Sequence, residues 1–222
     1  MTWLCFSSNG LSIPNQTRTD MMNPARCNSK TGGMNSKCRG VNLDFESSQI
    51  KSSVQALKEI DFELAYLALL TCEGLKPLSR WEKPLDEDGL ELLQQLGLLT
   101  KQIRRTVKTG KEVIETIFSR LPSYIWLYEE RFGNRPIDKS VQTRRFEGFL
   151  FGYPPCCVNE YIRKPYAANN LGAEEQKILF HWACRNCKIT PVLLDAYKSI
   201  YNSPIAAKCK PTGSEPIGMA SE

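Results

Sequence analysis

The sequence predicts an α+β domain that is predominantly helical and contains one small β-hairpin. Apolar residues recur at steps of three, four and seven in several stretches, which is the pattern of a helix with one buried face. One stretch differs: QIRRTVKTGKEVIETIF, residues 102–118, has two runs rich in Val, Ile and Thr on either side of Thr109-Gly110, a turn signal. The chain of 222 residues is long enough for one such domain, predicted at residues 46–204.

The predicted helices follow from capping residues and apolar spacing. Ser47 and Ser48 can cap a first helix, which apolar residues from Ile50 to Leu67 should continue to about Thr71. Acidic residues at its start and Gly97 at its end predict a second helix at 87–97. After the hairpin, we expect helices at 122–132, 138–150, 155–164, 172–183 and 190–201.

The two ends of the chain differ from this domain. Residues 1–45 are rich in Asn, Ser, Thr, Gly and Met without periodicity, which predicts a disordered extension. Residues 205–222 are rich in Pro, Gly and Ser, which predicts a flexible tail. Four cysteines lie in these ends and show no compact metal-binding spacing: Cys5, Cys27, Cys38 and Cys209.

Composition narrows the class of protein. No apolar run approaches the roughly 20 residues that span a bilayer, so we expect no membrane partner. The start of the chain lacks a basic region followed by a long apolar region, so it makes a poor signal peptide and we expect a cytoplasmic protein. Nine cysteines are present. In a reducing compartment, clustered cysteines are more often metal ligands or redox groups than structural bridges.

The stretch FGYPPCCVNEYIRK, residues 151–164, holds the first cysteine pair. Proline is favoured in the first turn of a helix, so Pro155 is expected to begin one and to place Cys156 and Cys157 in its first turn. The helix dipole and free amides there favour a thiolate, which predicts a lowered cysteine pKa. Because neighbouring side chains point in different directions, one cysteine is expected to be a ligand and the other a packing or reactive thiol.

The segment HWACRNC, residues 181–187, holds the second pair, Cys184 and Cys187, with the only histidine of the chain. A C-x-x-C turn brings two sulfurs within reach of one ion. His181 lies three residues before Cys184, on the same face if the segment is helical, and could supply a nitrogen ligand. Sulfur-rich ligation favours zinc or an iron–sulfur cluster. A catalytic site would need an open coordination position on the metal, and the sequence leaves undecided whether there is one. The candidate ligands are Cys156, Cys157, His181, Cys184 and Cys187.

These motifs resemble a prokaryotic domain family of unknown function with the pattern Gly-Tyr-Pro-x-Cys-Cys-Val followed by a His/Cys segment. The resemblance covers about residues 55–203 and implies no particular activity. It departs at Ala183, where the family pattern has proline, and in a tighter spacing of the last cysteines. The matching positions are Gly152, Tyr153, Pro154, Cys156, Cys157, His181, Cys184 and Cys187.

Two other functions remain open. The cysteine pairs could cycle between dithiol and disulfide, although no thioredoxin-like βαβ pattern precedes them. The hairpin could contact nucleic-acid phosphates, although the acidic helix before it would repel them. The chain has no Gly-rich phosphate-binding loop and no G-x-S-x-G nucleophile motif. The basic residues of the hairpin are Lys101, Arg104, Arg105, Lys108 and Lys111.

Overall fold

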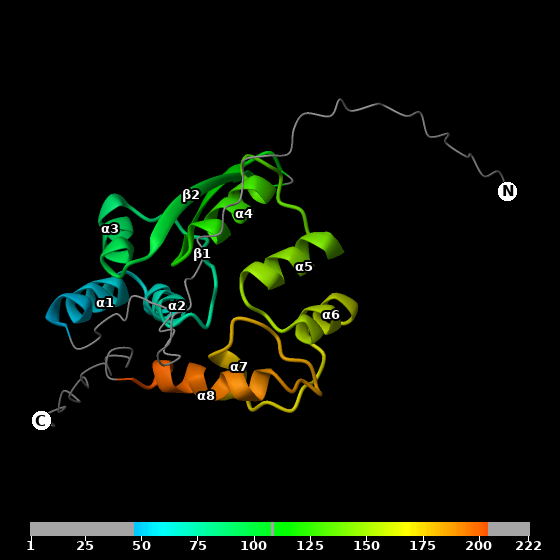
Figure 1. The fold of residues 1–222 in the computed structure, drawn as a ribbon. Helices are drawn as coiled ribbons and strands as arrows, with labels where there is room; N and C mark the ends of the chain where they lie inside the picture. The colour runs from blue at the N-terminus through cyan, green and yellow to red at the C-terminus, as the bar shows by residue number, and fades with distance from the viewer. Residues whose placement is uncertain (1–46, 108, 204–222) are drawn as a thin grey trace, which may run out of the picture. The chain divides into compact units, whose positions relative to one another are not determined.

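A computed structural model describes residues 47–107 and 109–203, within which eight helices and three strands are found. This composition confirms the predicted α+β class with mainly helical content (Figure 1). The predictions of a disordered extension at 1–45 and a flexible tail at 205–222 lie outside the described residues, as do Cys5, Cys27, Cys38 and Cys209. No helix in the described ranges has the length and apolar character needed to cross a bilayer.

The chain begins with two helices where the sequence predicted one. Helix α1 spans Ser48–Ile60 and α2 spans Phe62–Cys72. Asp61 between them is extended, and its side chain accepts a hydrogen bond from the backbone N–H of Glu63. An aspartate favours such a cap over a helix interior because its carboxylate can pair with the free amides of a new helix. The single helix predicted from Ile50 to Thr71 is therefore wrong at Asp61.

The predicted hairpin forms the centre of a three-stranded antiparallel sheet. Strands β2 (Leu99–Thr106) and β3 (Glu112–Ser119) pair with Ile103 opposite Glu115, and Gly110 in their turn has a φ of 82°. The short strand β1 (Ser79–Trp81) pairs with the other edge of β3, giving the order β1-β3-β2. The sequence did not predict β1.

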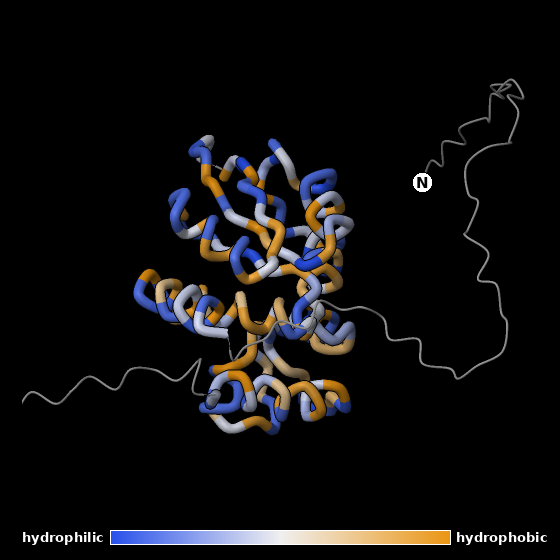
Figure 2. The backbone as a smooth tube through the Cα atoms, turned by 60° about the vertical axis from the view of Figure 1, so that its left-hand side comes forward, coloured by the Kyte–Doolittle hydropathy of each residue, from blue (hydrophilic) through white to orange (hydrophobic). Residues whose placement is uncertain are grey.

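Both faces of the sheet are covered, because successive side chains of a strand point to opposite faces. Phe118 packs into a core with α1, α2 and α3 (Glu87–Gln95), while Ile117 packs into another with α4 (Pro122–Phe132). Helix α2 is buried along most of its length and also contributes Tyr66 to a third core around α8 (Thr190–Tyr201). In Figure 2, hydrophobic and hydrophilic segments alternate along the tube, as expected for elements with one buried face.

The C-terminal part supplies the two cysteine motifs. Helix α5 (Val141–Leu150) leads through a tight turn to α6 (Pro155–Arg163), and α7 (Ala173–Lys177) and α8 follow (Figure 1). Helices α4, α6 and α8 match their predicted ranges closely, and α3 and α5 are two and three residues shorter.

Helix α7 ends at Lys177, six residues before the predicted end of the 172–183 helix. The Gln176 side chain replaces the missing helical bonds: its amide donates to the His181 carbonyl at 2.8 Å and accepts from the Ala183 N–H at 3.3 Å. These bonds hold residues 178–183 outside a helix, and His181 and Cys184 therefore do not share a helix face.

Candidate metal centre

The turn between α5 and α6 places the first cysteine pair. Gly152 has a φ of 72°, and a Cβ there would lie 2.7 Å from Pro77 Cδ, so glycine is required on both counts. Pro155 is the first residue of α6, as predicted, and the N–H of Val158 donates to the Pro154 carbonyl at 3.1 Å. Cys156 and Cys157 consequently occupy the first turn of the helix.

The second pair lies in a turn before α8. The N–H of Cys187 donates to the carbonyl of Cys184 at 3.2 Å, which closes the C-x-x-C turn, and α8 begins three residues later at Thr190. Closing the turn directs both sulfurs to the same side, where the start of α6 also lies.

The structure brings the four cysteines of the two pairs together. Their Sγ atoms all lie within 4.8 Å of one another, and the Cys156 and Cys187 sulfurs are 3.5 Å apart. Every cysteine in the described ranges is a free thiol. The expectation that adjacent Cys156 and Cys157 would separate into one ligand and one bystander is not met, because both sulfurs belong to the group. Four sulfurs at this spacing can hold a metal ion.

Backbone N–H groups and one hydroxyl donate hydrogen bonds to the cysteine sulfurs. The backbone N–H of Cys184 donates to Cys157 Sγ at 3.3 Å, and the N–H of Thr190 donates to Cys187 Sγ at 3.2 Å. The Thr190 hydroxyl also donates to Cys187 Sγ at 3.2 Å and lies 3.5 Å from Cys157 Sγ. Donors to sulfur favour the thiolate, which is the form that binds metal.

The thiols differ in acidity. Cys156 is exposed, but partial desolvation and the neighbouring thiols Cys187 and Cys184 raise its pKa to about 11, and burial raises the pKa of Cys157 further. Burial acts in the same direction on Cys187, but hydrogen bonds from Thr190, the Cys157 thiol and the Ile189 backbone together outweigh it and lower the pKa of Cys187 to about 7. The predicted lowering of the pKa at the start of α6 is therefore wrong. A helix terminus cannot offset burial among other thiols that would repel the charge.

His181 lies outside the group of four sulfurs. Its Nε2 is hydrogen-bonded to Thr190 Oγ1 at 3.0 Å, and its ring packs on Tyr153 with centroids 5.4 Å apart. Its Nδ1 is buried without a partner among the described residues, and burial, assisted by the charge of Lys76, lowers its pKa to about 4. A neutral histidine thus contacts the cysteines only through Thr190.

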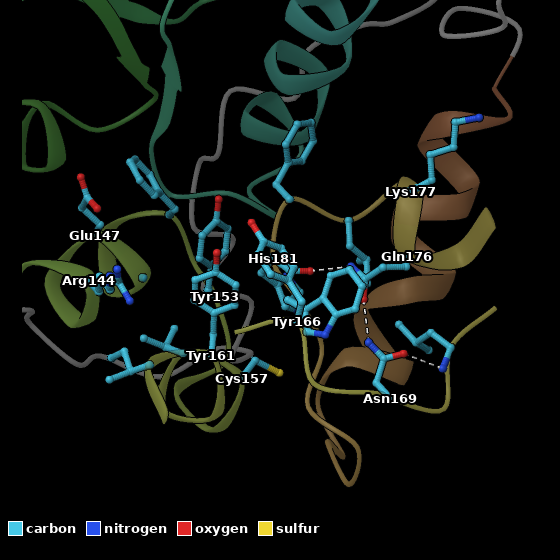
Figure 3. Close-up of a pocket in the computed structure, with 18 of the residues that line it drawn as sticks. Arg144, Glu147, Tyr153, Cys157, Tyr161, Tyr166, Asn169, Gln176, Lys177 and His181 are labelled. Atoms are coloured by element: carbon cyan, nitrogen blue, oxygen red, sulfur yellow. Dashed lines mark hydrogen bonds between the residues drawn. The ribbon is translucent and has the colours of Figure 1, made fainter. Parts of the chain in front are cut away.

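A cavity of about 870 Å³ adjoins the centre at Cys157 and His181, and Tyr153 also lines it (Figure 3). Trp182 is a further aromatic residue of its wall. Arg144 in its wall and the buried Lys76 behind Tyr153 were not predicted from the sequence. Neither residue belongs to a motif, so only the fold reveals them.

The basic surface predicted for the hairpin is smaller than its sequence indicates. Arg105 is only 2% exposed and pairs with Glu115 at 3.4 Å, and Lys101 pairs with Glu129 at 2.6 Å. Two of the five predicted phosphate contacts are thereby occupied, and Lys108 lies outside the described residues.

Comparison of the chain with protein-family models, with curated proteins and with solved structures finds no match. The fold and the thiol group thus define the class only as an α+β protein with a candidate four-cysteine metal centre.

Proposed function

We propose that the protein binds a single zinc ion through Cys156, Cys157, Cys184 and Cys187. One observation carries the proposal: four free thiol sulfurs from two distant motifs lie within 4.8 Å of one another. Four sulfurs brought this close would repel one another as thiolates, and a cation removes that repulsion.

The spacing of the sulfurs favours one ion over an iron–sulfur cluster. Around a tetrahedral zinc ion with Zn–S bonds of about 2.3 Å, neighbouring sulfurs are about 3.8 Å apart. In a cluster, cysteines bind different iron atoms, which spreads their sulfurs further. A group in which no pair exceeds 4.8 Å is closer to the first arrangement.

A site with four protein ligands is closed, which is typical of structural rather than catalytic zinc. Here it would tie the start of α6 to the start of α8 and fix the ends of the segment between them. Thr190 would support two of the ligands through its hydroxyl and N–H. Free thiols held for a metal fit a reducing compartment, so we place the protein in the cytoplasm.

The test is the metal content of the full chain, purified without oxygen, together with its visible spectrum. We expect about one zinc per chain and no colour. Cys184→Ser and Cys187→Ser should lose the metal, whereas Cys72→Ala, which removes a buried thiol outside the group, should retain it. If the protein instead contains iron and inorganic sulfide and shows a visible absorption band, the site holds an iron–sulfur cluster and not zinc. A folded, metal-free protein whose four thiols all react freely would overturn the metal site.

A thiol–disulfide function is the second candidate, favoured by the 3.5 Å separation of the Cys156 and Cys187 sulfurs and by the pKa of Cys187 of about 7. In this reaction the two thiols lose two electrons and two protons to an external disulfide, which becomes two thiols. Equilibration of metal-free protein with oxidised glutathione, followed by peptide mapping, tests it. A single Cys156–Cys187 disulfide supports the redox function, and scrambled or absent bridges contradict it.

A further inference from the structure

The large cavity beside the cysteines has the dimensions of a small-molecule site. Its volume of about 870 Å³ lies within the usual range of ligand pockets. Helices α5 and α6 form one wall, and residues 166–182 form the other. Figure 3 shows Arg144 and Glu147 on one side and Asn169, Gln176 and Lys177 on the opposite side.

Aromatic rings line the cavity in a connected series. The rings of Tyr161 and Tyr166 are 5.2 Å apart and those of Tyr166 and Trp182 are 5.3 Å apart, both edge to face. The Trp182 Nε1–H donates to the Ala167 carbonyl at 2.7 Å, which fixes the indole. Because these rings are held in place before a ligand arrives, a flat ring could stack here at little entropic cost.

Tyr166 has a second unusual property. Its φ is 57°, a conformation that residues other than glycine rarely adopt, and its side chain is nevertheless 67% exposed. Strained residues of this kind concentrate at ligand sites, because the fold maintains them at a cost to stability. The ring of Tyr166 is therefore displayed at the cavity and does not fill the core.

The cavity also has one cation without a counterpart. The Arg144 guanidinium forms no hydrogen bond or ion pair with any described residue. The neighbouring carboxylate of Glu147 is occupied by Arg80 at 2.8 Å and Arg105 at 3.7 Å. The amide groups of Asn169 and Gln176 bond to each other and to the backbone. A half-buried guanidinium with free donors is suited to a phosphate or carboxylate.

We propose that this cavity binds a small ligand in which a planar aromatic ring is joined to an anionic group, the chemistry of a mononucleotide. The ring stacks on the series of Tyr161, Tyr166 and Trp182, and the anion binds Arg144. The site depends on the cavity and not on which metal the cysteines hold, so its test is separate from the metal measurement.

The experiment is isothermal titration of the full chain, as purified, with four probes. AMP carries ring and phosphate, adenosine only the ring, inorganic phosphate only the anion, and indole-3-acetate a ring with a carboxylate. We expect AMP to bind at least tenfold more tightly than adenosine or phosphate. Tighter binding of indole-3-acetate than of AMP would identify the anion as a carboxylate and support the same site. Absence of binding by both ring-containing anions would overturn it.

Two variants assign the contacts. Arg144→Gln should reduce AMP affinity about tenfold and leave adenosine unchanged, whereas Arg145→Gln should change neither, because Arg145 pairs with Asn159 outside the cavity. Tyr166→Gly should weaken the binding of AMP and of adenosine by the same factor. The variant should stay folded because glycine readily adopts the positive φ of this position. Equal losses in Arg144→Gln and Arg145→Gln would refute the specific contact.

Discussion

Replacing Lys76 by methionine should change how the stability of the protein depends on pH. Lys76 is 2% exposed, and its Nζ donates one hydrogen bond, to the Phe151 carbonyl at 3.3 Å. The rings of Tyr153, Phe180 and Phe151 surround it at 4.6, 5.2 and 5.6 Å. No carboxylate in the described ranges forms an ion pair with it. Burial and the charge of Arg80 lower the pKa of Lys76 from 10.5 to about 7.

The sign follows from proton counting. Between pH 7 and pH 10.5 the unfolded chain carries a proton on Lys76 that the folded protein has lost, so the free energy of unfolding rises with pH. Below pH 7 both states are protonated and the full cost of burying the charge is present. These two pKa values give a gain of about 2.7 kcal/mol between pH 6 and pH 9. The surrounding aromatic rings stabilise the ammonium and so reduce this gain. We therefore expect the free energy of unfolding to rise by about 2 kcal/mol between pH 6 and pH 9.

The assay is urea unfolding of the wild type, Lys76→Met and Lys139→Met at pH 6, 7, 8 and 9. Subtracting each variant from the wild type cancels the titration of the cysteines, which all three proteins share. From pH 6 to pH 9 the free energy of unfolding of the wild type should rise by about 2 kcal/mol relative to that of Lys76→Met. Relative to Lys139→Met it should not change, because Lys139 is exposed. A difference from Lys76→Met that stays constant from pH 6 to pH 9 would show that the aromatic rings keep the ammonium charged, and would refute the reasoning.

Two further substitutions test the turn before α6 and the buried ion pair of the sheet, and thermal or urea unfolding measures both. Gly152→Ala should cost about 2–3 kcal/mol, because it adds a clash with Pro77 to the strain of a positive φ, whereas Gly74→Ala, with an equally positive φ and open space, should cost about 1 kcal/mol. Equal losses would mean that the contact with Pro77 is unimportant. Glu115→Gln should cost about 3 kcal/mol, since it removes the closer of the two carboxylates beside the buried Arg105 and leaves only Glu147 at 3.7 Å, and a loss below 1 kcal/mol would contradict this.

The fold was predictable where local signals were strong. The Thr109-Gly110 turn between two β-rich runs identified the hairpin, and Pro155 identified the start of α6. Strand β1 has only three residues, too few to show an alternating pattern in the sequence. It is a strand only because it pairs with β3 in the folded chain. The break at Asp61 was hidden because apolar residues on both sides keep a helical spacing across it.

The site was predictable only as a group of residue types. Cysteine spacing named the four sulfurs among five candidate ligands, but it assigned only one of Cys156 and Cys157 to the site. The placement of His181 relied on a helix that ends at Lys177. The acidity of the thiols depends on how closely they approach one another, which no local pattern encodes. The cavity draws its lining from residues as distant as Arg80 and Trp182, so only the folded chain reveals it.

The two cysteine pairs also make the segment between them a natural place for engineering. With the proposed zinc bound, its 26 residues, 158–183, would be anchored at both ends by the sulfurs, so a longer insert need not weaken the anchor. Doubling the length of a flexible loop costs only about 0.6 kcal/mol. Inserts at the exposed Ala168, between α6 and α7, leave the contacts of Ala167 and Asn169 in place and could therefore present new side chains beside the cavity. Such a library would make the protein a scaffold with a variable loop whose two ends are fixed by the cysteine pairs.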